Sequence, residues 1–143
     1  MPYRYLEDIA IADVAFEAWG ETIEEMIVAA SDATINVMVE NPDAIIGRDH
    51  RRFQVTDAEL DMLLFQVLQE LIYFKDAEGL LLRVRTLHLE QNQGTWTATV
   101  EADGEPIDPQ RHHLIVDVKA VTLHRFRVQE TARGWSATVI VDV

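Results

Sequence analysis

Two aspartates in apolar surroundings are the residues best placed to do chemistry. Asp13 lies within residues 11–20 and Asp142 within residues 139–143, and both stretches have the apolar, β-branched composition typical of strands. A carboxylate in such a strand costs free energy unless a cation or a set of hydrogen-bond donors meets it. We therefore predict that the two strands lie side by side and that the two aspartates share a cation.

The ligand set that these residues offer suits a hard metal ion. Ca²⁺, Mg²⁺ and Mn²⁺ prefer oxygen ligands from several carboxylates, and the terminal carboxylate of Val143 would add a third ligand to Asp13 and Asp142. Carboxylates brought so close repel one another or take up protons unless a cation neutralises them. The alternative is that both aspartates point to solvent at strand ends, and spacing alone favours that alternative.

Other kinds of chemistry find little support in the sequence. The five histidines lack the spacing of a helical zinc site, and His112 with His113 reads as an ordinary loop pair. The absence of cysteine excludes a thiolate metal site, a disulfide framework and a cysteine nucleophile. There is also no serine nucleophile elbow and no phosphate-binding glycine loop. We expect the protein not to be an enzyme.

Composition and charge indicate an acidic globular protein. The 143 residues predict a single domain spanning 1–143, and the net charge of −13 disfavours direct binding to nucleic acid, whose phosphates require cationic partners. A basic partner protein or a divalent cation is a better match. No apolar run reaches the roughly 20 residues that cross a bilayer, and the start of the sequence does not resemble a signal peptide. We therefore expect no membrane association and a cytoplasmic location.

The first half of the chain contains two predicted helices. Thr22 and Glu25 form a capping-box pattern ahead of apolar residues at helical spacing, which predicts a helix from there to about Val39. Residues 41–50 are typical of a loop, and residues 51–55 of a short strand. A second capping-box pattern at residues 56–59 predicts a helix with a leucine-rich stripe that ends near Gly79.

From residue 80 onward the apolar period changes to that of strands. Residues 80–91 and 95–102 form a predicted hairpin around the turn at 92–94, and residues 103–113 are rich in turn formers. Residues 116–130 and 135–143 are predicted as the last two strands, the final one lying inside the sheet next to the first strand. The resulting class is α+β, a two-layer arrangement with a mostly antiparallel, mixed sheet and two amphipathic helices on one face.

Several motifs, in order along the chain, resemble the archease family. They are residues 5–8, 12–16, 19–20 and 22–25 near the start, then residues 71–79, residues 104–109, the strand 119–124 from Lys119 to His124, and finally residues 134–135 and 141–143. Each motif is loose by itself, but together they span nearly the whole chain. Departures occur at Ala10 and Ile11, where many archeases have a polar pair, and at Leu123 and Arg125, which flank the histidine.

The resemblance implies an accessory protein rather than an enzyme. Archeases activate the tRNA-splicing RNA ligase by promoting guanylylation of its active-site histidine, so that the ligase turns over repeatedly. The family also implies a bound divalent cation, Ca²⁺ being the ion expected in a crystal, held here by Asp13, Asp142 and Val143. This implication makes the metal site the favoured interpretation of the two aspartates.

Two roles remain open for Lys119, and three functions for the protein. Lys119 could meet phosphate or balance the nearby carboxylates, and the second is slightly favoured. His124 is a possible contact to a partner or to phosphate, although a strand histidine is more often structural. The rival functions are a chaperone-like or cation-binding protein for RNA-processing enzymes such as tRNA methyltransferases, and, least favoured, a metal-dependent hydrolase.

Overall fold

The computed structural model describes residues 2–7 and 13–143, which form helices and strands in both halves of the chain. In order these are β1 (Tyr3–Tyr5), β2 (Val14–Gly20), α1 (Ile23–Met38), the short 3-10 helix η1 (Pro42–Ala44), β3 (Asp49–Asp57), α2 (Leu60–Glu78), β4 (Leu80–Asn92), β5 (Thr95–Pro106), β6 (Ala120–Thr131) and β7 (Gly134–Asp142). None of the helices in the described part is long and apolar enough to span a membrane.

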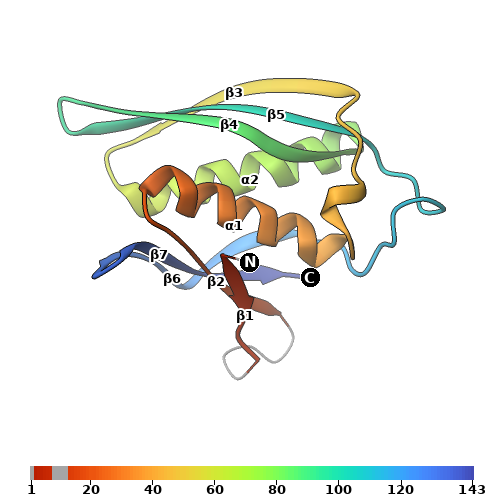
Figure 1. The fold of residues 1–143 in the computed structure, drawn as a ribbon, viewed down its shortest axis with the longest axis horizontal. Helices are drawn as coiled ribbons and strands as arrows, with labels where there is room; N and C mark the ends of the chain where they lie inside the picture. Colours follow the sequence, from red (N-terminus) through yellow and green to blue (C-terminus); the bar gives the residue numbers. More distant parts are fainter. Residues whose placement is uncertain (1, 8–12) are drawn as a thin grey trace.

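The strands form two antiparallel sheets with the helices between them (Figure 1). One sheet has the order β1-β2-β7-β6 and the other the order β3-β5-β4, and all their pairings are antiparallel. The predicted α+β class with two helices is confirmed. The arrangement differs from the prediction in having three layers and two sheets, where the sequence indicated two layers and one sheet.

The composition of α1 explains the third layer. Ten of its sixteen residues are buried, and they cover most of the helix circumference, leaving a partly exposed strip at Val28, Asp32 and Asn36. The buried hydroxyls of Ser31 and Thr34 donate hydrogen bonds to main-chain carbonyls one turn earlier, so they do not need water. A helix buried over so wide an arc must be covered on more than one face, and here a sheet covers each of two sides.

The start of α1 matches its predicted cap. The Thr22 hydroxyl accepts a hydrogen bond from the Glu25 amide at 3.1 Å, and the Glu25 carboxylate accepts one from the Glu21 amide at 2.8 Å. Gly20 precedes this turn because a Cβ there would collide with the Glu25 side chain and the main chain of Met26. The last strand residue and the first helical turn therefore lie in direct contact.

The second predicted cap is wrong. Thr56 lies within β3, opposite Thr97 of β5, and the cap of α2 is Glu59, whose side chain makes no capping hydrogen bond. The Asp57 carboxylate instead accepts a hydrogen bond from the Glu59 amide at 2.9 Å. A Thr-x-x-Glu pattern cannot distinguish these cases, because cross-strand pairing of Thr56 competes with capping. The predicted end of α2 is confirmed, since Gly79 takes the left-handed conformation with φ of 66°.

Three other strand boundaries differ from the predictions. β5 continues to Pro106, because Gly104 allows it to approach β4 so closely that a Cβ would overlap the Leu81 carbonyl. The predicted strand at residues 116–130 begins only at Ala120, and the residues before it form an irregular connection. The short strand β1 and the full length of β3 were not predicted either. Residues 8–12, which include the first two residues of the strand predicted at 11–20, lie outside the described residues.

The predicted contact between the first and last long strands is confirmed. β7 is an inner strand, paired with β2 on one side and with β6 on the other. Phe16, Ala18, Val139 and Val141 alternate toward the helices and are fully or almost fully buried. This inner position explains why residues 139–143 are so apolar, and it fixes where Asp142 lies.

Candidate metal centre

Asp13 and Asp142 are neighbours at the edge of the β2–β7 ladder. In this ladder Val14 is the partner of Val141, Asp13 directly precedes Val14, and Asp142 directly follows Val141. The two aspartates are therefore the next opposed positions. Directly opposed residues of an antiparallel pair have Cβ atoms about 5 Å apart, a separation at which two carboxylates can share one ion.

The side on which these residues lie is set by strand alternation. Asp13 is two residues before Ala15 and Asp142 is two residues after Ile140, so strand alternation places each aspartate on the same sheet face as its neighbour. Ala15 and Ile140 are buried but are not part of the core around the helices. The two aspartates therefore belong to the sheet face turned away from α1 and α2. Both aspartates are partly exposed, and neither carboxylate forms a hydrogen bond or ion pair with any residue of the described ranges.

Val143 and Lys119 lie at the same end of the sheet. The Lys119 amide donates a hydrogen bond to the Asp142 carbonyl at 2.8 Å, and Ala120 is the β6 partner of Asp142. The Lys119 side chain is exposed and takes part in no ion pair among the described residues, while the Val143 side chain packs against the core. The backbone thus brings together four of the five residues that the sequence singled out.

His124 lies farther along β6, in an irregular part of the strand. The pairing of β6 with β7 is interrupted between Thr122 and Arg127, and Arg125 has a positive φ of 54°. Inside this bulge Phe126 packs edge-on against Phe65 of α2, with ring centroids 6.0 Å apart, while His124 is exposed. A bulge re-aims side chains at the edge of a site, so His124 points to solvent near the candidate centre but outside the regular ladder.

The donor set suits a hard divalent cation but is small. Asp13 and Asp142 offer carboxylate oxygens, and Val143, the third residue named from the sequence, lies at the same end of the sheet. Within residues 2–7 and 13–143 no group of three or more His, Cys, Asp or Glu side chains is arranged to hold a metal ion. Two partly exposed carboxylates without protein partners fit a cation that keeps several water ligands.

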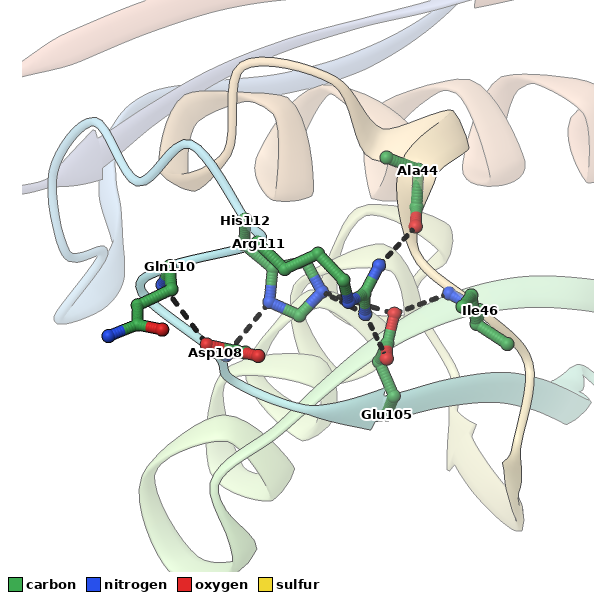
Figure 2. A network of polar contacts seen from close by, with 7 residues as sticks. All are labelled: Ala44, Ile46, Glu105, Asp108, Gln110, Arg111 and His112. Carbon is green, nitrogen blue, oxygen red and sulfur yellow. Dashed lines mark hydrogen bonds and ion pairs between the residues drawn. The ribbon is translucent and has the colours of Figure 1, made fainter.

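A second polar cluster, which sequence analysis missed, lies where β5 ends (Figure 2). The Glu105 carboxylate is 2% exposed and accepts hydrogen bonds from the Ile46 amide at 2.5 Å and from His112 Nε2 at 3.1 Å. It also forms an ion pair with Arg111, whose guanidinium donates a further hydrogen bond to the Ala44 carbonyl. The cluster joins the end of β5 to two loops.

Protonation states in this cluster follow from its hydrogen bonds. The Asp108 amide donates to His112 Nδ1 at 2.9 Å, so the other ring nitrogen carries the proton that reaches Glu105. Burial alone would raise the pKa of Glu105, but hydrogen bonds from Ile46, Arg111 and His112 lower it to about 2. This cluster is structural, because every polar group in it is directed at another part of the same chain.

The same connection contains a buried lysine. Lys75 of α2 is 6% exposed, and its amine donates hydrogen bonds to the Asp117 carboxylate and, at 2.7 Å, to the Val118 carbonyl. The Asp76 carboxylate lies 2.7 Å from the same amine. No local pattern indicated this pairing, because Lys75 and Asp117 are 42 residues apart in the sequence and Asp117 lies in an irregular connection.

A cleft of about 1040 Å³ lies at the opposite end of β2 and β7. Its lining includes Gly20, Trp19 and Trp135 together with carboxylates such as Glu21 and Glu24 of the α1 start. Gly20 is the last residue of β2, whereas Asp13 precedes its first, so the cleft and the candidate metal centre are separate. The volume of a cleft therefore does not identify the candidate metal centre.

Comparison with known proteins defines the family. The model of the archease protein family (MTH1598/TM1083) matches residues 3–143. The archease of Methanosarcina mazei is 33% identical over 142 residues, covering 99% of this chain and 95% of that protein. The archease of Pyrococcus furiosus is 32% identical over 133 residues, covering 92% of this chain and 93% of that protein. This chain belongs to the archease family.

Solved structures agree with this assignment. The solution structure of protein 1598 from Methanobacterium thermoautotrophicum superposes with a TM-score of 0.86 at 26% identity and covers 99% of both chains. The crystal structure of an archease from Thermotoga maritima, described as a possible chaperone, has a TM-score of 0.59 at 15% identity. That match covers 98% of this chain and all of the other, and it supports the fold alone.

Proposed function

We propose that this protein is a cytoplasmic accessory protein of the tRNA-splicing RNA ligase. In this proposal it promotes guanylylation of the ligase's active-site histidine and allows repeated turnover, and it joins no RNA itself. Membership of the archease family supports the role, and the net charge of −13 favours a protein partner over direct contact with RNA.

The observation that carries the proposal is the register of β2 and β7. It makes Asp13 and Asp142 opposed neighbours on one sheet face, with no protein cation among the described residues to neutralise them. A divalent cation bound there would supply positive charge for phosphate oxygens beside the ligase's nucleotide. Asp13, Asp142 and the terminal carboxylate of Val143 would hold and orient it, Mg²⁺ or Mn²⁺ being the candidates in solution and Ca²⁺ in a crystal.

Lys119 and His124 complete the proposed contact surface. Both side chains are exposed, and Lys119 is hydrogen-bonded through its main chain to Asp142. In the proposal, Lys119 limits the repulsion between the two carboxylates and the incoming phosphates, and His124 contacts the ligase. Neither residue transfers a proton or forms a bond to the nucleotide.

The test compares guanylylation of the ligase with wild-type protein and with Asp13→Asn and Asp142→Asn. We expect each substitution to reduce the stimulated rate about tenfold or more, because each removes half of the side-chain ligand set. Asp43→Asn is the matched control, since the Asp43 side chain is 86% exposed and, among the residues that the structure describes, forms an ion pair with Arg83 alone. Full stimulation by a folded Asp142→Asn protein would remove the centre from the mechanism.

A second candidate function is a chaperone-like role for several RNA-processing enzymes, including tRNA methyltransferases. The description of the Thermotoga maritima archease as a possible chaperone favours it. The two functions differ in their partners. Affinity purification that recovers the ligase alone would argue against the broader role, whereas comparable recovery of a methyltransferase would support it.

A further inference from the structure

Three consecutive aliphatic residues are exposed in the connection between β5 and β6. Leu114, Ile115 and Val116, here called the apolar segment, are 46%, 56% and 42% exposed. Single exposed aliphatic residues are common in soluble proteins, but a contiguous apolar patch rimmed by charge marks an interaction surface. The sequence predicted Val116 as the start of a strand, and the structure leaves it outside the sheet.

The main chain of the apolar segment is fixed on its first side by α1. The His113 carbonyl accepts a hydrogen bond from the Glu40 amide at 2.9 Å, and the Ile115 amide donates to the Met38 carbonyl at 2.8 Å. These bonds form an isolated antiparallel bridge around Leu114. The segment is therefore held as an extended chain against the end of α1.

Polar contacts also fix the main chain that follows the apolar segment. The Lys75 amine holds Asp117 and the Val118 carbonyl, and the next residue, Lys119, is hydrogen-bonded to Asp142. Polar contacts thus hold the connection on both sides, while the three aliphatic side chains of the apolar segment stay exposed. A surface held in one conformation loses little entropy when a partner binds.

A small hollow accompanies the exposed side chains. It has a volume of about 250 Å³ and is lined mainly by apolar groups, among them Met38, Leu81 and Ile107 together with the apolar segment. Asp117 lines it together with Lys75, whose amine also contacts Asp76, and the side chains of Asp117 and Asp76 are 62% and 57% exposed. An apolar centre with a charged rim is the usual anatomy of a protein interface.

The position of this surface indicates its partner. The apolar segment ends three residues before Lys119, whose amide donates a hydrogen bond to the Asp142 carbonyl, so the chain leads from this surface to the end of the sheet that carries the candidate metal centre. A large enzyme that engages Asp13 and Asp142 can therefore reach both places. The acidic rim of this surface matches an enzyme that binds RNA phosphates through basic side chains.

We propose that the apolar segment and its hollow are the anchor through which this protein binds the tRNA-splicing RNA ligase. The ligase contributes an aliphatic or aromatic side chain to the hollow and basic side chains to the Asp76 and Asp117 rim. This inference rests on the proposed function. It separates two tasks, since the apolar segment supplies affinity while the carboxylates beside it supply the stimulation.

The experiment measures the dissociation constant of the complex with the ligase and the guanylylation rate across a range of accessory-protein concentrations. Ile115→Asp and Val116→Asp should each raise the dissociation constant about tenfold or more, because a carboxylate replaces a buried anchor. At saturating concentration the guanylylation rate should return to the wild-type value. Asp142→Asn should differ in that the rate stays low even at saturating concentration.

Tyr73→Asp is the control for exposed apolar surface. Tyr73 is 56% exposed, as Ile115 is, and it lies two residues from Lys75, about 200° around α2. It should leave the dissociation constant within about twofold of the wild type, while thermal unfolding confirms that each variant is folded. Leu114→Ser is a milder variant that serves if either aspartate substitution prevents folding.

Three results would overturn the inference. Unchanged affinity in folded Ile115→Asp protein, together with lost stimulation in Asp142→Asn, would remove the anchor and leave the proposed function intact. A wild-type protein that neither binds nor stimulates the ligase would remove both. A wild-type dimer that Ile115→Asp converts to a monomer, without changing ligase affinity, would assign the surface to a second copy of this chain.

Discussion

Replacing Glu105 with glutamine tests the buried cluster at the end of β5. The carboxylate accepts hydrogen bonds from Ile46 and His112 and pairs with Arg111, and these contacts lower its pKa from 4.5 to about 2. Because one pKa unit corresponds to about 1.4 kcal/mol, ionised Glu105 contributes about 3 kcal/mol to the free energy of unfolding at neutral pH. Glu105→Gln should remove most of this and lower the unfolding midpoint by about 9 °C.

The pH dependence of the same difference gives the sharper test. The pKa of Glu105 in the folded protein is below its unfolded value, so its contribution is fully present above about pH 4.5 and is lost as the pH falls toward 2. Urea unfolding of wild type and Glu105→Gln, followed by circular dichroism between pH 7 and pH 3, should show the two free energies of unfolding converging below pH 4.5. The comparison cancels the many other carboxylates that titrate in both proteins.

The control is Glu90→Gln, which makes the same chemical change at a side chain that is 69% exposed. It should alter the free energy of unfolding by less than about 0.5 kcal/mol at any of these pH values. A difference between wild type and Glu105→Gln that is equally large at pH 7 and pH 3 would refute the assignment of the stability to the ionised carboxylate.

Two further substitutions test contacts that position the helices and the apolar segment. Lys75→Met should lower the free energy of unfolding by about 2 kcal/mol, because the Val118 carbonyl loses its hydrogen-bond donor. It should also speed amide hydrogen exchange in the connection before β6. Unchanged exchange in this connection would contradict the role given to Lys75. Thr22→Ala should lower the free energy of unfolding, measured in urea, by about 1 kcal/mol, because α1 loses its cap. Thr56→Ala should lower it clearly less, since Thr56 caps no helix. Equal losses of stability in the two variants would contradict this assignment of the caps.

Several local features of the fold were predicted correctly from sequence, although the local pattern at Thr56 was not. The cap at Thr22, the left-handed Gly79, the hairpin at residues 92–94 and the apolar last strand each depend on a few adjacent residues, and all are confirmed. The number of layers was not predictable in the same way. An apolar stripe shows that a helix is buried but does not say how many sheets cover it, and α1 is covered on two sides.

The candidate site, like the fold, was only partly predictable from the sequence. The pairing of the strands that carry or adjoin Asp13 and Asp142 could be predicted, because a carboxylate in an apolar strand is costly and so conspicuous, whereas the shared cation remains a prediction. The cluster around Glu105 could not, because Glu105 and His112 lie in a stretch of turn formers and Ile46 contributes only its main chain. His112, interpreted as an ordinary loop residue, is 3% exposed, and nothing in its neighbours along the sequence indicated burial.

The pairing of β2 with β7 also constrains how the protein folds. Closing the loop between Val14 and Val141 costs more chain entropy than closing any of the hairpins, whose strands are adjacent in sequence. The segment from β3 to β5 can assemble from local contacts around α2, whereas the sheet of β2, β7 and β6 requires the two ends of the chain to meet. We therefore expect the candidate centre to form late in folding, because it depends on the pairing with the largest separation in sequence.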